Sequence, residues 1–436
     1  MHPDPHASAV VDARLGRPPR DVIEATIVLE AWAGRPARTA LAAARGLLPQ
    51  GIPPLRINGR LDKADGDEQH GVVVEGIALV LSILSVAAWA KPLSHTLGPH
   101  ALARAIGFAL PIAVALQWAL RSRYLSRRAG LALLAADGLA CTALAGLGVE
   151  LPLALVPHWG PIAAMLVATW TAGIVMTRRG WGLPYAIALV ASAVALDEHI
   201  SAYLVLGLLT AFTLSGCLAG VLTQRAPTDD RPGRIRRAVI AGVLGGSIGS
   251  LMVDDRSLGW GVHGVHPAIA LVPSVVGSLW GGYYLWNLYE AVPRGLSGVS
   301  LGGASRLGVR DPAMAVFAGA LVRLVGVTVI LSVVVIGIDQ WMGGSDALSV
   351  FIAFGAVAVV SMLVALLESL GRQGAALLAM GAALAAEFVW PHLTHPSIAG
   401  GGLLAGTVIG IVLTVPPLIT LLSRSGRLLA TTLWIH

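Results

Sequence analysis

Charged residues are scarce in this sequence. Only 12% of its 436 residues are Asp, Glu, Lys or Arg, whereas 56% are hydrophobic. A typical soluble domain contains about 25% charged residues. The composition therefore excludes an ordinary soluble globular protein and is typical of a chain that lies mostly in lipid.

Cysteine is scarce, and motifs for nucleotide binding are absent. The two cysteines, Cys141 and Cys217, both fall inside apolar segments, so we expect small buried side chains rather than a disulfide framework or a CxxC metal site. No P-loop, HExxH or dinucleotide-binding signature occurs at a credible place, and we expect no nucleotide-dependent reaction and no cofactor. The formal charge is +6. The arginines lie in short loops between apolar runs, which predicts membrane topology and no nucleic-acid partner.

Long apolar runs, in contrast, are abundant. A spanning helix needs about 20 mainly apolar residues, and the sequence has twelve runs of this kind, the seventh of them short. This pattern predicts an all-α, polytopic integral membrane protein with about twelve transmembrane helices arranged as six plus six. The runs cover residues 71–90, 100–120, 129–149, 158–176, 181–198, 200–223, 238–253, 265–290, 313–338, 347–369, 373–391 and 398–422.

Arginine marks alternate ends of these runs. The segment after the second run holds Arg121, Arg123, Arg127 and Arg128, and arginine recurs after every later even-numbered run. The segments after the odd-numbered runs hold little that is basic. By the positive-inside rule, we expect a multi-pass protein of the cell membrane with both termini in the cytoplasm. No apolar run follows a short basic start, so we expect no cleavable signal peptide.

Polar segments divide the chain into parts. Helical patterns over 21–48 predict a helical hairpin, which is a candidate contact for a cytoplasmic partner. Proline, glycine and charge follow and indicate a linker. The predicted parts are a cytoplasmic extension (1–70), a first membrane half (71–224), a cytoplasmic linker (225–237), a second membrane half (238–423) and a cytoplasmic tail (424–436).

Two prolines occupy corresponding spans of the two halves. Pro111 lies in the middle of the second run and Pro273 in the eighth. We predict helix breaks at both, because interrupted spans at matching places are the usual sequence indication of a transport site. Glycine spacings at Gly245/Gly249 and over 402–410 instead predict close packing between helices.

Asp137 and Arg323 are charged residues within apolar runs. A charge at the bilayer centre costs about 2.5–3.5 kcal/mol on insertion scales, so neither is expected to face lipid. They have opposite signs and lie at similar depth in the third and ninth runs, which suggests an ion pair. Such a pair either fixes how the halves dock or lines a cavity that binds substrate, and both interpretations stay open.

The eighth run ends in a dense aromatic group. An aromatic belt at the membrane surface explains part of it, but Trp280 lies deeper than a belt requires. Aromatic faces beside hydroxyl, amide and carboxylate groups would suit a sugar or a lipid head group. We therefore add these residues to the candidate substrate cavity with Asp137 and Arg323: Trp280, Tyr283, Tyr284, Asn287 and Glu290.

The expected outer loops are rich in histidine. Two HxxH pairs occur, His263/His266 and His392/His395, and histidine is both a zinc ligand and an acid–base group. Their spacing matches no defined metal motif, and the prolines beside them are typical of loop ends. Plain loop histidines are the main expectation, and a metal or catalytic site is the alternative.

The layout resembles two groups of transporters. The major facilitator group has a Gly-x-x-x-Asp-Arg-x-Gly pattern in the loop after its second span, and the loop here, RSRYLSRRAG, has neither the leading glycine nor the aspartate of that pattern. The layout is more similar to exporters and flippases of polysaccharides or lipid-linked oligosaccharides, in twelve spans, basic cytoplasmic loops, and the placement of Asp137, Arg323 and the aromatic group. This resemblance covers the membrane part and implies export of a lipid-linked or polymeric glycan by alternating access.

Two other functions remain open at this stage. One is a membrane transferase for glycosyl or acyl groups that uses the outer histidines with Asp254 and Asp255. The other is a non-transporting assembly factor that binds a cytoplasmic partner through residues 21–48. The outer loops are short and leave little room for an acceptor site, which favours transport over an enzymatic reaction.

Overall fold

The structure is a computed structural model, and it is all-α wherever it is described. No β-strand occurs within those residues. The description covers residues 4–15, 19, 22–34 and 37–47, separate helical positions between 78 and 93, and residues 95–120, 127–147, 159–178, 180–222, 232–253, 273–274, 306–341, 348–393 and 400–422.

The membrane helices follow the predicted apolar runs. From the second run to the seventh, and from the ninth to the twelfth, each run coincides with a helix. Six described helices are long and apolar enough to cross a membrane, so the prediction of an all-α polytopic membrane protein is confirmed. The ten described helices that coincide with apolar runs are α5 (Pro99–Leu120), α6 (Arg127–Leu147), α7 (Trp159–Arg178), α8 (Gly182–Asp197), α9 (Ala202–Leu222), α10 (Pro232–Leu251), α13 (Arg306–Trp341), α14 (Leu348–Ser369), α15 (Gln373–Leu393) and α16 (Gly401–Leu422).

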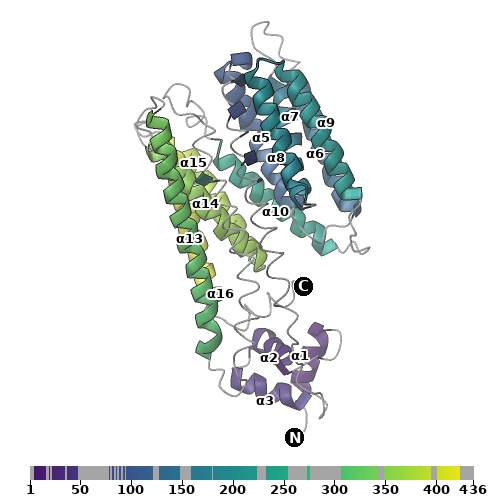
Figure 1. Ribbon diagram of the computed structural model, residues 1–436. Helices are drawn as coiled ribbons and strands as arrows, with labels where there is room; N and C mark the ends of the chain where they lie inside the picture. Colours follow the sequence, from purple (N-terminus) through teal and green to yellow (C-terminus); the bar gives the residue numbers. More distant parts are fainter. Residues whose placement is uncertain are drawn as a thin grey trace.

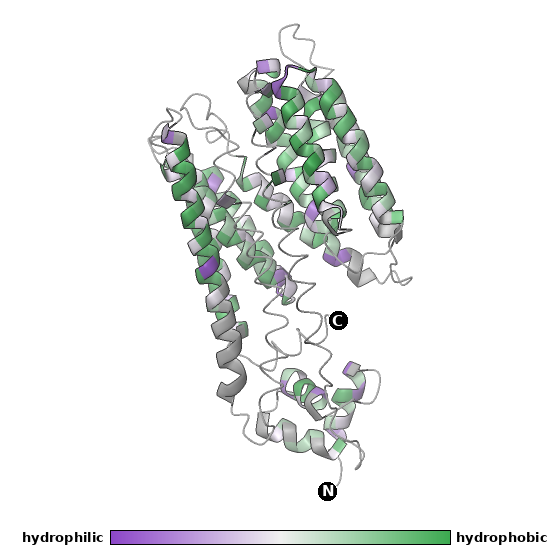
Figure 2. Cartoon of the chain, in the orientation of Figure 1, coloured by the Kyte–Doolittle hydropathy of each residue, from purple (hydrophilic) through white to green (hydrophobic). Residues whose placement is uncertain are grey.

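These helices form two groups (Figure 1). In the first, α7 lies at the centre and contacts α5, α6, α8 and α9. In the second group, α14 is central: 83% of the residues in its membrane-spanning stretch are buried, whereas only 17% are buried in that of the peripheral helix α13. Helix α10 packs on α5 and also on α15, and so links the groups. Hydrophobic residues dominate the helices of both groups (Figure 2), and many large apolar side chains are exposed, as contact with lipid requires.

Hydrogen bonds from polar side chains connect the neighbouring helices to α7. Because lipid offers no hydrogen-bond partners, a side chain that is polar at this depth has to bond within the protein. Side chains of three neighbouring helices donate hydrogen bonds to backbone carbonyls of α7, which supports its central position. The bonds run from Cys141 Sγ to Ala164 O (3.3 Å), from Tyr185 Oη to Thr169 O (2.9 Å) and from Gln117 Nε2 to Trp170 O (2.6 Å).

A similar bond joins the first predicted run to α8. The Trp89 indole N–H donates to Ser192 Oγ at 3.1 Å, and both residues are buried. We expect Ser192→Ala to lower the free energy of unfolding by about 1–3 kcal/mol, since it leaves a buried N–H without its partner. Thermal unfolding of the detergent-solubilised protein measures the loss. Ser215→Ala is the matched control, because the exposed Ser215 hydroxyl bonds only Ala211 O in its own helix. Equal melting temperatures for the two variants would contradict the prediction.

The glycine spacings mark close helix contacts, as predicted. A Cβ atom on Gly245 would lie 2.6 Å from Trp118 and from the Val114 carbonyl of α5, and one on Gly249 would lie 2.7 Å from Pro111 Cα. In the second group, a Cβ on Gly406 would lie 2.7 Å from the Ala383 carbonyl. Glycine is needed there because the helix backbones approach too closely for any side chain.

Pro111 does not break its helix, contrary to prediction. Helix α5 runs from Pro99 to Leu120 with Pro111 in its interior. Membrane helices tolerate proline where neighbouring helices pack closely, and Gly249 of α10 packs against Pro111 itself. The second predicted break, Pro273, lies in a helical pair of residues whose flanks fall outside the described part.

The N-terminal residues form a small helical unit. The two helices expected over 21–48 are α2 (Val22–Trp32) and α3 (Ala37–Leu47), and they pack together. A further helix, α1 (Pro5–Leu15), was not predicted. Only two residues of the sequence mark the start of this helix: Asp4, whose Oδ1 accepts hydrogen bonds from the His6 and Ala7 N–H groups, and Pro5, which occupies the first turn.

Candidate functional site

Asp137 lies midway along α6, inside the first helix group. Only 1% of its surface is exposed, whereas Leu139, two residues later, is 72% exposed. Helix α6 therefore turns the carboxyl group toward α7 and α9 and its leucine outward. This arrangement meets the expectation that a charge at this depth avoids lipid.

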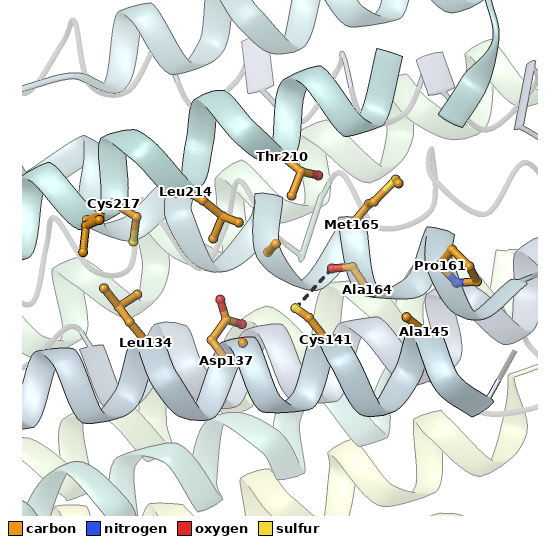
Figure 3. Close-up of a pocket in the computed structure, with 13 residues that line it drawn as sticks. Leu134, Asp137, Cys141, Ala145, Pro161, Ala164, Met165, Thr210, Leu214 and Cys217 are labelled. Carbon is orange, nitrogen blue, oxygen red and sulfur yellow. Dashed lines mark hydrogen bonds between the residues drawn. The ribbon is translucent and has the colours of Figure 1, made fainter. Parts of the chain in front are cut away.

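The Asp137 carboxyl faces a cavity between α6, α7 and α9 (Figure 3). The cavity has a volume of about 400 Å³, which falls in the range typical of ligand pockets. Among the described residues, its wall is almost entirely apolar and contains no aromatic and no basic side chain. The lining residues are Leu134, Asp137, Gly138, Cys141 and Ala145 of α6, Pro161, Ala164, Met165 and Ala168 of α7, and Thr210, Leu214, Cys217 and Leu218 of α9.

Three polar side-chain atoms in or beside the cavity lack a partner in the described part of the chain. Asp137 Oδ1 has no hydrogen-bond partner among the described residues, and the same holds for the hydroxyls of Thr171 and Thr210. The Thr171 hydroxyl lies near the Asp137 carboxyl but forms no hydrogen bond that meets the usual limits of distance and angle. A buried carboxyl group is stable only when paired or hydrogen-bonded. The site is therefore built to receive a hydrogen-bond donor or a positive charge from outside the protein.

Both cysteines of the chain line this same cavity. Cys141 follows Asp137 by one helical turn, and Cys217 lies opposite on α9 (Figure 3). Neither cysteine forms a disulfide, as expected; Cys217 is buried as predicted, whereas Cys141 is only partly buried. Sequence reasoning missed their place beside Asp137, although the spacing of Asp137 and Cys141 already puts them on one helix face.

The structure does not bring Arg323 to Asp137. Every residue that lines the Asp137 cavity comes from α6, α7 or α9, whereas Arg323 is exposed on α13 in the other helix group. The expected ion pair is therefore absent. The apolar stretch of α13 extends on both sides of Arg323, from Ala313 to Ile338.

Most other predicted site residues fall outside the described part. These are the aromatic group (Trp280, Tyr283, Tyr284, Asn287 and Glu290) and the histidines His263, His266 and His395. The remaining histidine, His392, is exposed, and its ring lies edge-on to Phe388 with centroids 5.6 Å apart. Within the described residues, no three His, Cys, Asp or Glu side chains are grouped as a metal site requires.

Comparison with known proteins yields little. No protein-family model matches the chain, and no curated protein matches it in sequence. The chain is similar to a solved structure described as "Crystal structure of MATE in the bent conformation", with a TM-score of 0.39 and 10% identity over 84% of this chain and 97% of that one. That score is too low to establish a common fold, and the function has to be argued from the site itself.

Proposed function

We propose that this polytopic membrane protein is a transporter and that the Asp137 cavity is a binding site in its transport cycle. The observation that carries the proposal is the Asp137 Oδ1 atom, which has no partner among the described residues and faces a cavity of about 400 Å³ halfway along α6. A carboxyl group that served only to hold helices together would have a partner in the protein. Ionisable residues inside membrane helices that face a cavity are typical of substrate and ion pathways.

The cavity constrains what binds there. A cationic group or another hydrogen-bond donor would satisfy the Asp137 carboxyl, with the Thr210 hydroxyl as a second polar contact. An oligosaccharide does not fit, because the wall offers no aromatic face and almost no polar group. If the protein exports a lipid-linked or polymeric glycan, Asp137 therefore acts as the coupling site, and the glycan binds elsewhere. The aromatic group at 280–290 stays the predicted glycan contact.

The proposed orientation places the protein in the cell membrane with its termini in the cytoplasm. The exposed turn between α14 and α15 contains Arg372, whereas the exposed turn between α8 and α9 (198–201) contains no lysine or arginine. These turns follow an even-numbered and an odd-numbered run. This distribution of basic residues agrees with cytoplasmic and outer ends, respectively.

Complementation tests the proposal. Cells depleted of the protein are assayed for accumulated lipid-linked glycan and then supplied with wild type, Asp137→Ala, His263→Ala or Asp197→Ala. We expect Asp137→Ala to reduce clearance of the glycan by about 30-fold or more, since losing one partner of a buried charge contact costs about 2–5 kcal/mol. His263→Ala and the exposed-acid control Asp197→Ala should clear it normally.

Each other result overturns part of the proposal. Full clearance by Asp137→Ala would remove the Asp137 cavity from the transport cycle. Failure of His263→Ala together with success of Asp137→Ala would favour the membrane transferase. No accumulation after depletion would reject a glycan as the cargo.

A further inference from the structure

We infer that the Asp137 cavity opens sideways into the bilayer, between α6 and α9, and that it takes a lipid-soluble amine. The inference rests on the proposed function, because it names the access route and ligand class of the same site.

The opening lies between α6 and α9. Both helices pack along α7 but touch each other only sparsely. The floor of the cavity is buried, with Asp137 and Cys217 each 1% exposed. Residues of the same lining on the outer side are exposed: Gly138, Leu214 (41%) and Leu218 (48%). The lining thus passes from buried to exposed across the gap between these two helices.

The surface around this opening is apolar. Leu139 of α6 is 72% exposed, and Leu208 and Phe212 of α9 are 66% and 45% exposed. Side chains of this kind at mid-helix face hydrocarbon in a membrane protein. A ligand that uses this opening therefore arrives from the lipid phase and has to be soluble in it.

The floor determines which lipid-soluble ligand is favoured. The cavity combines one carboxyl group, whose Oδ1 atom lacks a partner among the described residues, with an apolar wall that has no basic residue. An ammonium head would donate hydrogen bonds to Asp137 and neutralise it, while its alkyl chain would lie against Leu214 and Leu218. A phosphate or sulfate head would be repelled by the carboxylate. A neutral alcohol would leave the charge of the carboxylate uncompensated.

The two native cysteines report occupancy and access. Purified protein in lipid nanodiscs is labelled with the lipid-soluble N-phenylmaleimide, and the labelling rate of Cys141 and Cys217 is measured by mass spectrometry. Dodecylamine, dodecanol, dodecyl sulfate and ethylamine are compared as ligands. We expect dodecylamine, at ten times its dissociation constant, to slow labelling by about tenfold through simple mass action. Dodecanol, dodecyl sulfate and the short-chain ethylamine should leave the labelling rate unchanged.

Variants separate the opening from the head-group contact. Leu214→Trp should slow labelling by narrowing the opening, whereas Leu208→Trp, on the same helix but outside the cavity, should not. Asp137→Asn should keep the unprotected labelling rate and lose protection by dodecylamine. All three retain an apolar or isosteric side chain, and a monodisperse size-exclusion profile verifies folding.

Three results would overturn the inference. A charged, water-soluble thiol reagent that labels both cysteines as fast as N-phenylmaleimide would show that the cavity opens to water. Equal protection by dodecanol would reject the amine, and equal slowing by both tryptophan variants would reject the opening. None of these results alters the complementation by Asp137 variants, so the proposed function is judged separately.

Discussion

Asp137→Leu is expected to yield a protein that is more stable than wild type and inactive in transport. Asp137 Oδ1 is buried without a hydrogen-bond partner among the described residues, and leaving such a group unsatisfied costs about 1–3 kcal/mol. Leucine has a similar length and suits the apolar wall formed by Leu134, Leu214 and Leu218. The substitution removes the cost of desolvation together with the only carboxyl group of the cavity lining.

Two measurements on the same preparation check this prediction. The melting temperature of the solubilised protein should rise by a few degrees, and complementation should be lost as completely as with Asp137→Ala. Asp197→Leu is the control, because Asp197 is exposed at the C-terminal end of α8 and its loss should change neither quantity. A lower melting temperature for Asp137→Leu would show that the carboxyl group supports the fold, and it would weaken the assignment of Asp137 to a binding site.

The membrane architecture could be predicted from the sequence because its cause is local. A helix that crosses hydrocarbon needs a continuous apolar stretch, and each such stretch is visible without knowledge of its neighbours. The same locality explains the glycine contacts, where Gly245 and Gly249 lie one turn apart on the face that meets α5. The short helix α1 was missed because its Asp4 cap precedes a segment that is not strongly apolar.

The cavity could not be predicted because it depends on how three helices face one another. On α6, the spacing of Asp137 and Cys141 indicates a shared face, but nothing in the sequence shows that Thr210 and Cys217 of α9 lie opposite. The position of Arg323 also depends on how helices face one another: Arg323 is exposed on α13, in the helix group that does not contain Asp137. An ion pair inferred from depth in two separate helices therefore failed, while the burial of Asp137 was correctly expected.

Gly249→Ala is expected to destabilise the protein by about 1–3 kcal/mol, the usual cost of overpacking. The added Cβ would lie 2.7 Å from Pro111 Cα, 3.0 Å from Leu110 O and 3.1 Å from Pro111 N. All three atoms belong to the α5 backbone, so no side-chain rotation relieves the clash and α10 has to move away from α5. Because α10 also packs on α15, we expect this shift to disturb the contact between the helix groups and to reduce transport as well.

Gly207→Ala of α9 provides the matched comparison, since its Cβ would meet no atom within 4 Å. Alanine favours a helix over glycine by about 0.8–1 kcal/mol, so this variant should be as stable as wild type or slightly more so. Thermal unfolding in detergent measures both variants, and complementation measures transport. If Gly249→Ala matched Gly207→Ala in both assays, α10 would not be held against α5 as closely as the glycine contacts require, and its role as the link between the helix groups would be lost. A stable Gly249→Ala protein with impaired transport would instead show that α5 and α10 separate readily in the folded state but must meet during the transport cycle.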